Sequence, residues 1–172
     1  LIEVDGKKIL NANDCILETP DRVQDIKNIT DTVDILFTQF SYANWVEGGV
    51  SDSSSRASLA NEKLERIRMQ ADVLKPSSIV PFASMVRFCH TENSYMNDEI
   101  NTPKQTVNFI ESNTRSKAFL MVPYENWNGE SSKNNQTAVQ FWEKAYENAL
   151  KRPLIEPKKS YNVTEIKLAF KA

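Results

Sequence analysis

Short apolar segments rich in β-branched residues alternate along this chain with longer segments of helical periodicity. The strand-like segments are Leu1–Val4, Lys8–Ala12, Val33–Phe40, Ser78–Phe82 and Ala118–Val122. Strands that alternate with helices favour a layered architecture in which helical crossovers connect neighbouring strands. We therefore predict an α/β (α+β) fold in which a hairpin is followed by alternating strands and helices.

The first two predicted strands form a hairpin. Asp5-Gly6 separates them, and this dipeptide favours a two-residue type I′ turn because glycine adopts positive φ without steric cost.

Four helices are predicted between and after the strands. From Ser54 to Leu74 apolar residues recur at spacings of three and four, which indicates one helix face packed on a sheet. Thr19-Pro20 and Thr102-Pro103 each start a further helix, because proline fits the first helical position. The last predicted helix spans Asn134 to Lys151.

Composition excludes several partners. The net charge of −2 lacks the basic excess of a nucleic-acid-binding surface, and no apolar run approaches the ~20 residues of a membrane span. Cys15 and Cys89 are too few for a disulfide framework, which favours reduced thiols in the cytosol. We predict a single cytoplasmic domain with a small-molecule substrate and no nucleic-acid or membrane partner.

Several kinds of catalytic site are also excluded. The sequence has no Gly-x-Gly-x-x-Gly, no Gly-Lys-Ser/Thr and no Gly-x-Ser-x-Gly, so the common nucleotide-binding loops and the serine-hydrolase elbow are absent. Without a Cys-x-x-Cys pair or a second histidine, the chain cannot build a complete zinc site in the usual way.

Polar segments follow three consecutive predicted strands: Asn11–Cys15, Thr38–Trp45 and Phe82–Asp98. In open α/β sheets, ligand sites gather just beyond the carboxyl ends of the strands. Asp14 and His90, the single histidine, are the candidate metal ligands and catalytic groups in these segments. The alternative for Asp14 is a helix-cap or turn residue, and the alternative for His90 is a structural loop residue.

Two stretches of the chain carry a resemblance to a known family. They are Asp-Gly-Lys-Lys-Ile-Leu-Asn-Ala-Asn-Asp-Cys at 5–15 and Val-Asp-Ile-Leu-Phe-Thr-Gln-Phe at 33–40. They resemble the second half of metallo-β-lactamase-fold proteins, most closely the branch of CMP-N-acetylneuraminate hydroxylase and the ascorbate-lactonase-like proteins. In that branch the metal-bridging aspartate stands in an Asn-Asp-Cys sequence, as Asp14 does here. Ala43-Asn44-Trp45 and Pro81-Phe82-Ala83 are also similar.

The resemblance implies half of an αββα sandwich and, in the whole protein, a metal-dependent hydrolase-like or hydroxylase-linked activity. Zn²⁺ or another divalent transition metal would lower the pKa of a bound water. Asp14 would bridge or orient the metal, and His90 would ligate it or act as an acid. The predicted substrate-binding residues are Asn13, Gln39, Asn44, Trp45 and Glu92, with Phe88 and Tyr95 adding to an aromatic platform beside Trp45.

The chain departs from the family pattern in two places. The defining His-x-His-x-Asp-His is absent, and Ala83 stands where the family has its last metal-binding histidine. The chain also begins on a strand at Leu1 without a methionine, which is typical of a piece of a longer protein. We expect such a piece to lack a complete metal site, to be inactive by itself and to associate through an exposed sheet face.

Two other functions stay open beside the enzyme. One is a non-catalytic α/β binding module that uses residues 41–56 and 83–98 to recognise a partner. The other is a catalytically dead relative that keeps the fold and Asp14 but not the metal. We assign residues 1–152 to the metallo-β-lactamase-like half domain and residues 153–172 to a tail or the start of an appended element.

Overall fold

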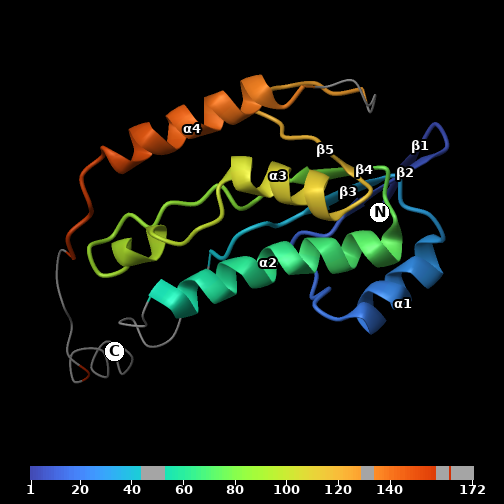
Figure 1. The fold of residues 1–172 in the computed structure, drawn as a ribbon, viewed down its shortest axis with the longest axis horizontal. Coiled ribbons are helices and arrows are strands. Elements are labelled where there is room, and N and C mark those ends of the chain that lie inside the picture. Colours follow the sequence, from blue (N-terminus) through green and yellow to red (C-terminus); the bar gives the residue numbers. More distant parts are fainter. Residues whose placement is uncertain (44–52, 129–133, 158–162, 164–172) are drawn as a thin grey trace, which may run out of the picture.

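The computed structural model describes residues 1–43, 53–128, 134–157 and 163, and within these ranges five strands form one sheet beside four α-helices (Figure 1). The strands are β1 (Ile2–Val4), β2 (Lys7–Asn11), β3 (Ile35–Thr38), β4 (Ser78–Pro81) and β5 (Lys117–Ala118). The helices are α1 (Pro20–Thr30), α2 (Ser53–Leu74), α3 (Pro103–Asn113) and α4 (Gln136–Leu150), with a 3₁₀ turn at Ser94–Asn97. The predicted α/β fold class is confirmed.

The strands lie in the sheet in the order in which they occur in the chain, β1-β2-β3-β4-β5. β1 pairs antiparallel with β2, and each later pair is parallel. Asp5 (φ 49°) and Gly6 (φ 73°) both have positive φ in the β1–β2 turn, as a type I′ turn requires.

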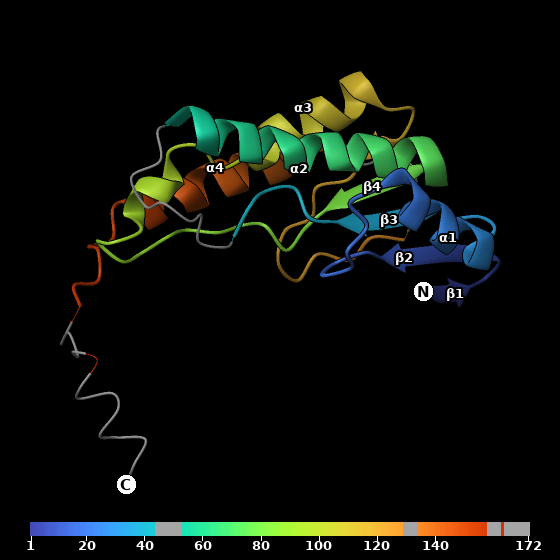
Figure 2. The ribbon, with the colours of Figure 1, turned by 90° about the horizontal axis from the view of Figure 1, so that it is seen from below.

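All four α-helices of the described residues pack on one face of the sheet (Figure 2). Right-handed crossovers between parallel strands in sequential order always bring the helix back to the same side. The resulting core joins alternate strand residues to every helix. Its main contributors are Leu10, Leu36 and Ile79 from the strands and Val23, Ile67, Leu74, Ile110 and Ala138 from the helices.

The opposite face of the sheet carries a smaller apolar cluster in which no described helix takes part. Ile35, Val80 and Phe119 are its buried members, and Ile9, Phe37, Met121 and Trp127 are partly exposed. The Trp127 ring stacks on Phe119 with 4.4 Å between ring centroids. This loop tryptophan covers one end of the face, and we call the whole cluster the open sheet face.

The last strand is shorter than the predicted Ala118–Val122, and a side chain occupies its outer edge. Asn135 accepts a hydrogen bond from the Leu120 backbone N–H (2.8 Å) and donates one to the Ala118 carbonyl (2.7 Å). Asn135 thereby takes the place of a further strand and satisfies the edge groups that would otherwise be open to pairing.

Helix α2 differs from its predicted amphipathic pattern in the first turn. Ala57, expected on the buried face, is exposed, whereas Arg56 is buried. The Arg56 guanidinium lies 5.2 Å from the Tyr95 ring centroid and 3.6 Å (Nη2 to Oδ2) from Asp98. Burial of this cation is tolerated because an aromatic face and a carboxylate accompany it.

Candidate functional site

The three polar segments predicted to share a sheet edge do so, because β2, β3 and β4 are adjacent and parallel. The first two segments are joined where Gln39 reaches Asn13. The second and third are joined where the Phe40 backbone N–H donates to Ser84 Oγ at 3.0 Å. Hydrogen bonds therefore connect the three segments to one another at the carboxyl edge of the sheet.

Asp14 lies at the centre of this edge with a side-chain amide on each carboxylate oxygen. Gln39 Nε2 donates to Oδ1 at 3.2 Å, and Asn13 Nδ2 donates to Oδ2 at 3.0 Å. Gln39 Nε2 also lies 2.8 Å from Asn13 Oδ1, so the three side chains form a closed ring of contacts. We call Asn13, Asp14 and Gln39 the Asp14 cluster.

The backbone at the Asp14 cluster adopts a conformation that is rare for residues with side chains. Asp14 has φ 54°, and the next backbone N–H, that of Cys15, donates back to the Asn13 carbonyl at 2.7 Å. The Asp14 side chain is exposed at this turn. A left-handed residue in a tight turn is compatible with the turn role considered for Asp14, since Asp tolerates this region better than most residues.

A buried polar layer, which the sequence reading missed, supports the edge from below. Thr38 Oγ1 donates to Gln70 Oε1 at 2.8 Å, and Gln70 Nε2 donates to the Leu17 carbonyl at 3.3 Å. Asn101 Nδ2 donates to the carbonyls of Phe40 (2.7 Å) and Ala60 (2.6 Å). Only the polar identity of Gln70 on the inner stripe of α2 signalled this layer in the sequence.

Ala83 lies at the same edge, directly after β4, and is exposed with φ 54°. This is the position at which the resemblance expects a metal-binding histidine. The neighbouring Ser84 is 1% exposed and accepts the Phe40 N–H described above. The chain therefore places a methyl group, rather than an imidazole, next to the carboxyl edge.

The contacts that the structure gives His90 are with residues other than those of the Asp14 cluster. Its backbone N–H donates to Asn93 Oδ1 at 3.1 Å, and its backbone pairs with Ile155 in an isolated bridge. Residues 153–157 thus return from α4 along segment 89–91. The metal and acid roles of His90 and the exposed Glu92 stay predictions.

The described residues of the predicted aromatic platform, Phe88 and Tyr95, belong to a cluster of packed side chains. Phe88 and Tyr95 pack with Tyr42, Ala60 and Met96, and the Tyr42 hydroxyl donates to the Met96 carbonyl at 2.8 Å. Burial raises the pKa of Tyr42 above its ordinary value, and the positive charge of Arg56 acts in the opposite direction. The other predicted substrate-binding residues, Asn44 and Trp45, lie outside the described residues.

The described residues place one candidate metal ligand, Asp14, at the carboxyl edge and do not complete a site. Within ranges 1–43, 53–128 and 134–157, no three His, Cys, Asp or Glu side chains come together in a metal-binding group. The Asp14 carboxylate fits a metal because both of its oxygens are oriented by amides, as ligating carboxylates commonly are. The remaining ligands of a catalytic metal would have to come from elsewhere.

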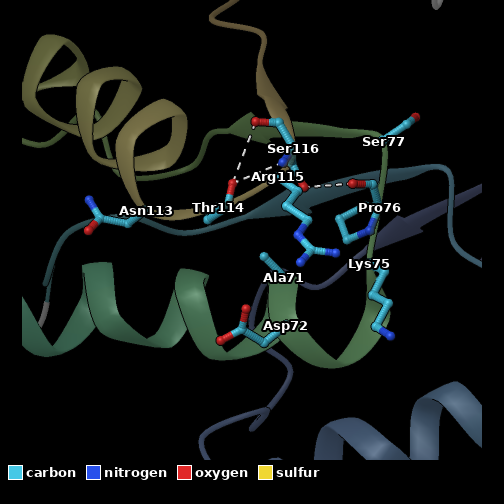
Figure 3. Close-up of a pocket in the computed structure, with 9 residues that line it drawn as sticks. All are labelled: Ala71, Asp72, Lys75, Pro76, Ser77, Asn113, Thr114, Arg115 and Ser116. Atoms are coloured by element: carbon cyan, nitrogen blue, oxygen red, sulfur yellow. Dashed lines mark hydrogen bonds between the residues drawn. The ribbon is translucent and has the colours of Figure 1, made fainter.

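A large cavity of about 710 Å³ lies at the opposite, amino edge of the sheet. Figure 3 shows Lys75 and Arg115 on its wall, beside the ends of α2 and α3. Both side chains are exposed. Helix carboxyl ends attract cations, so the two helix termini account for this pair of charges without a ligand.

The fold and the edge geometry define an α/β domain with helices on one face of a mixed sheet and an amide-held carboxylate at its carboxyl edge. No protein-family model, curated protein or solved structure matches the chain in comparison. Among the described residues, none of the helices combines the length and the apolar character needed to cross a lipid bilayer.

Proposed function

We propose that this chain is part of a metal-dependent, hydrolase-like protein of the metallo-β-lactamase fold, in which Asp14 contributes one metal ligand. The observation that carries the proposal is the Asp14 carboxylate itself, held on both oxygens by Asn13 and Gln39. In this proposal the other ligands are His90, which stays a predicted ligand, and groups outside the described residues.

The contacts of Asp14 favour a ligand role over a purely structural one. A turn aspartate usually accepts hydrogen bonds from the backbone of its own turn, whereas this carboxylate accepts from two side-chain amides. One of them, Gln39, reaches across from the next strand. Amides orient a carboxylate without neutralising it, so its negative charge stays available to a cation.

The arrangement of the layers supports the metallo-β-lactamase fold named in the proposal. In an αββα sandwich each sheet carries helices on one face and packs its other face on the second sheet. This chain has all its described α-helices on one face and the apolar open sheet face on the other. Such a surface suits the second sheet of a sandwich.

The residues of this chain would hold and orient the reacting groups. A bound divalent metal supplies a water of lowered pKa. Asp14 would fix the position of the metal, while Gln39 and Asn13 would keep the carboxylate from rotating. The amide groups of Gln39 and Asn13 also offer polar contacts to a substrate oxygen at the same edge.

Metal analysis of the complete gene product tests the proposal. We expect a bound transition metal that is lost, wholly or in large part, on Asp14→Ala. The matched control is Asp25→Ala, which removes an exposed carboxylate from the outer face of α1 and should leave the metal content unchanged. Absence of any transition metal, with no effect of Asp14→Ala, would contradict the proposal.

A non-catalytic binding module is the second candidate, and the order within segment 83–98 favours it. Asn97 accepts from the Phe88 N–H (2.8 Å) and donates to the carbonyls of Phe88 (2.8 Å) and Ser94 (2.9 Å). These bonds hold the segment in one shape, which a partner-recognition surface requires. Metal-free protein that is indifferent to Asp14→Ala would favour this function.

A further inference from the structure

Two adjoining cavities lie between helix α4 and the chain that follows β4. Their volumes are about 230 Å³ and 170 Å³, and both are lined by Val86, Arg87, Tyr146 and Ala149. We call these two cavities the α4 groove. We propose that the α4 groove binds a small apolar carboxylate, whose oxygens accept hydrogen bonds from Tyr146 and Arg87. The proposal is independent of the metal site.

Two hydrogen-bond donors in the walls of the groove, both on side chains, have no acceptor among the described residues. They are the Tyr146 hydroxyl and Arg87 Nε, and both atoms are buried from solvent. Buried polar groups in folded proteins are almost always hydrogen-bonded, because an unpaired one costs about 1–3 kcal/mol. A carboxylate that enters the groove would supply the missing acceptors.

The rest of the Arg87 guanidinium is already fixed. Its Nη2 donates to the Arg152 carbonyl at 2.7 Å, just beyond the end of α4. This bond holds the guanidinium at the groove, where Nε is its buried donor without an acceptor. A carboxylate suits such a site better than a neutral acceptor, because hydrogen bonds between an ionised donor and an ionised acceptor are the stronger kind.

The walls and the size of the groove limit the body of the ligand. Met85, Trp142, Ala145 and Leu150 add apolar surface to the shared lining. Each cavity is smaller than the ~300–1,000 Å³ of a pocket for a drug-sized molecule. The geometry therefore fits a short alkyl or single-ring carboxylic acid.

One negatively charged side chain faces the groove, and a nearby cation offsets its charge. Asp98 lines the larger cavity, and its carboxylate lies 3.6 Å from Arg56 Nη2. Because Asp98 is paired and largely exposed, its repulsion of a bound anion is screened by solvent.

Titration of the full chain with hexanoate, followed by ¹H–¹⁵N NMR, tests the proposal, with 1-hexanol as the neutral probe of the same length. We expect saturable shifts confined to the amides of segment 85–87 and the last two turns of α4. Hexanol should bind more weakly, by roughly tenfold or more.

Tyr146→Phe and Arg87→Met should each weaken hexanoate binding by roughly tenfold. Tyr146→Phe removes only a hydroxyl that has no acceptor, so the fold is preserved even if Arg87→Met perturbs the Arg152 contact. Arg115→Met, at the amino-edge cavity, is the control and should change nothing. Three results would overturn the proposal. They are equal binding of hexanoate and hexanol, hexanoate binding by Tyr146→Phe that equals that of the wild type, and the absence of any saturable shift.

Discussion

Gln39 Nε2 lies 3.2 Å from Asp14 Oδ1. This contact links the carboxyl end of β3 to that of β2, between residues 25 positions apart in the sequence. The contact depends on the parallel register in which Asn11 is paired with Phe37. Two residues beyond each of these partners lie Asn13 and Gln39, which brings the amide of one strand end to the carboxylate turn of the other.

Gln39→Leu should weaken metal binding in the complete gene product by roughly ten- to a hundredfold, the usual effect of losing a group that orients a ligand. Asp14 is exposed and Gln39 is half-buried, so folding stability should change by no more than about 1 kcal/mol. Competition with a chromophoric chelator measures the affinity. Gln24→Leu removes a comparable amide, bonded to Asn28 on α1, and should leave the affinity at the wild-type value.

Asn101→Ala should destabilise the protein by about 2–4 kcal/mol, because it leaves the Phe40 and Ala60 carbonyls unpaired in the core. Urea unfolding followed by circular dichroism gives the change in the free energy of unfolding. Asn108→Ala, at an exposed position of α3, should stay within about 0.5 kcal/mol of wild type. Similar values for both variants would argue against the buried polar layer.

Ala83→Gly should stabilise the protein by up to about 1 kcal/mol, since glycine adopts the φ of 54° found there without the strain of a Cβ atom. Ala57→Gly, at an exposed helical position of α2, should have the opposite sign and cost about 0.5–1 kcal/mol. Thermal unfolding of both variants measures the pair. Destabilisation by Ala83→Gly would mean that the left-handed geometry at Ala83 is not retained in solution.

The stability of the protein should fall as pH rises between about 10 and 12. Burial raises the pKa of Tyr146 to about 12, while the Val86 backbone opposes the shift. An unfolded chain therefore releases this proton near pH 10, whereas the folded protein still holds it, so unfolding is favoured above that pH. Tyr146→Phe should reduce the slope of unfolding free energy against pH in this window and leave it unchanged below pH 9.

The chain by itself should self-associate through the open sheet face, and Ile9→Lys should reduce that association. Ile9 is a partly exposed member of the cluster, so a lysine there places a charge in the contact surface. Sedimentation velocity measures the oligomeric state. Ile29→Lys, which changes a 79% exposed isoleucine on α1, should leave the oligomeric state as it is in the wild type.

Periodicity and turn chemistry predicted the elements of this fold well, because they depend on neighbours in sequence. Asp5-Gly6 and the two Thr-Pro pairs mark ends that the structure places within a residue of the prediction. The side chain that covers the outer edge of β5 was not predictable in this way, since Asn135 lies 15 positions beyond Leu120.

The candidate site likewise contains residues that local sequence predicts and residues that it does not. Asp14, Asn13 and Gln39 follow strands, and strand ends can be placed from sequence. Gln70, Ser84 and Asn101 are fixed by partners more than 30 residues away, and their side chains are those of ordinary surface residues. No local pattern distinguishes a buried Asn101 from the exposed asparagines that are common in this chain.

The strand order β1-β2-β3-β4-β5 also bears on how the molecule forms. Each of these strands pairs with the strand that precedes it in the chain. The edge to which a strand adds has therefore already been synthesised. Contacts between sequence neighbours lower the entropy lost on closing loops, which favours fast folding. Such a sheet can grow stepwise along the chain during translation, with the β1–β2 hairpin preceding the strands that add to it.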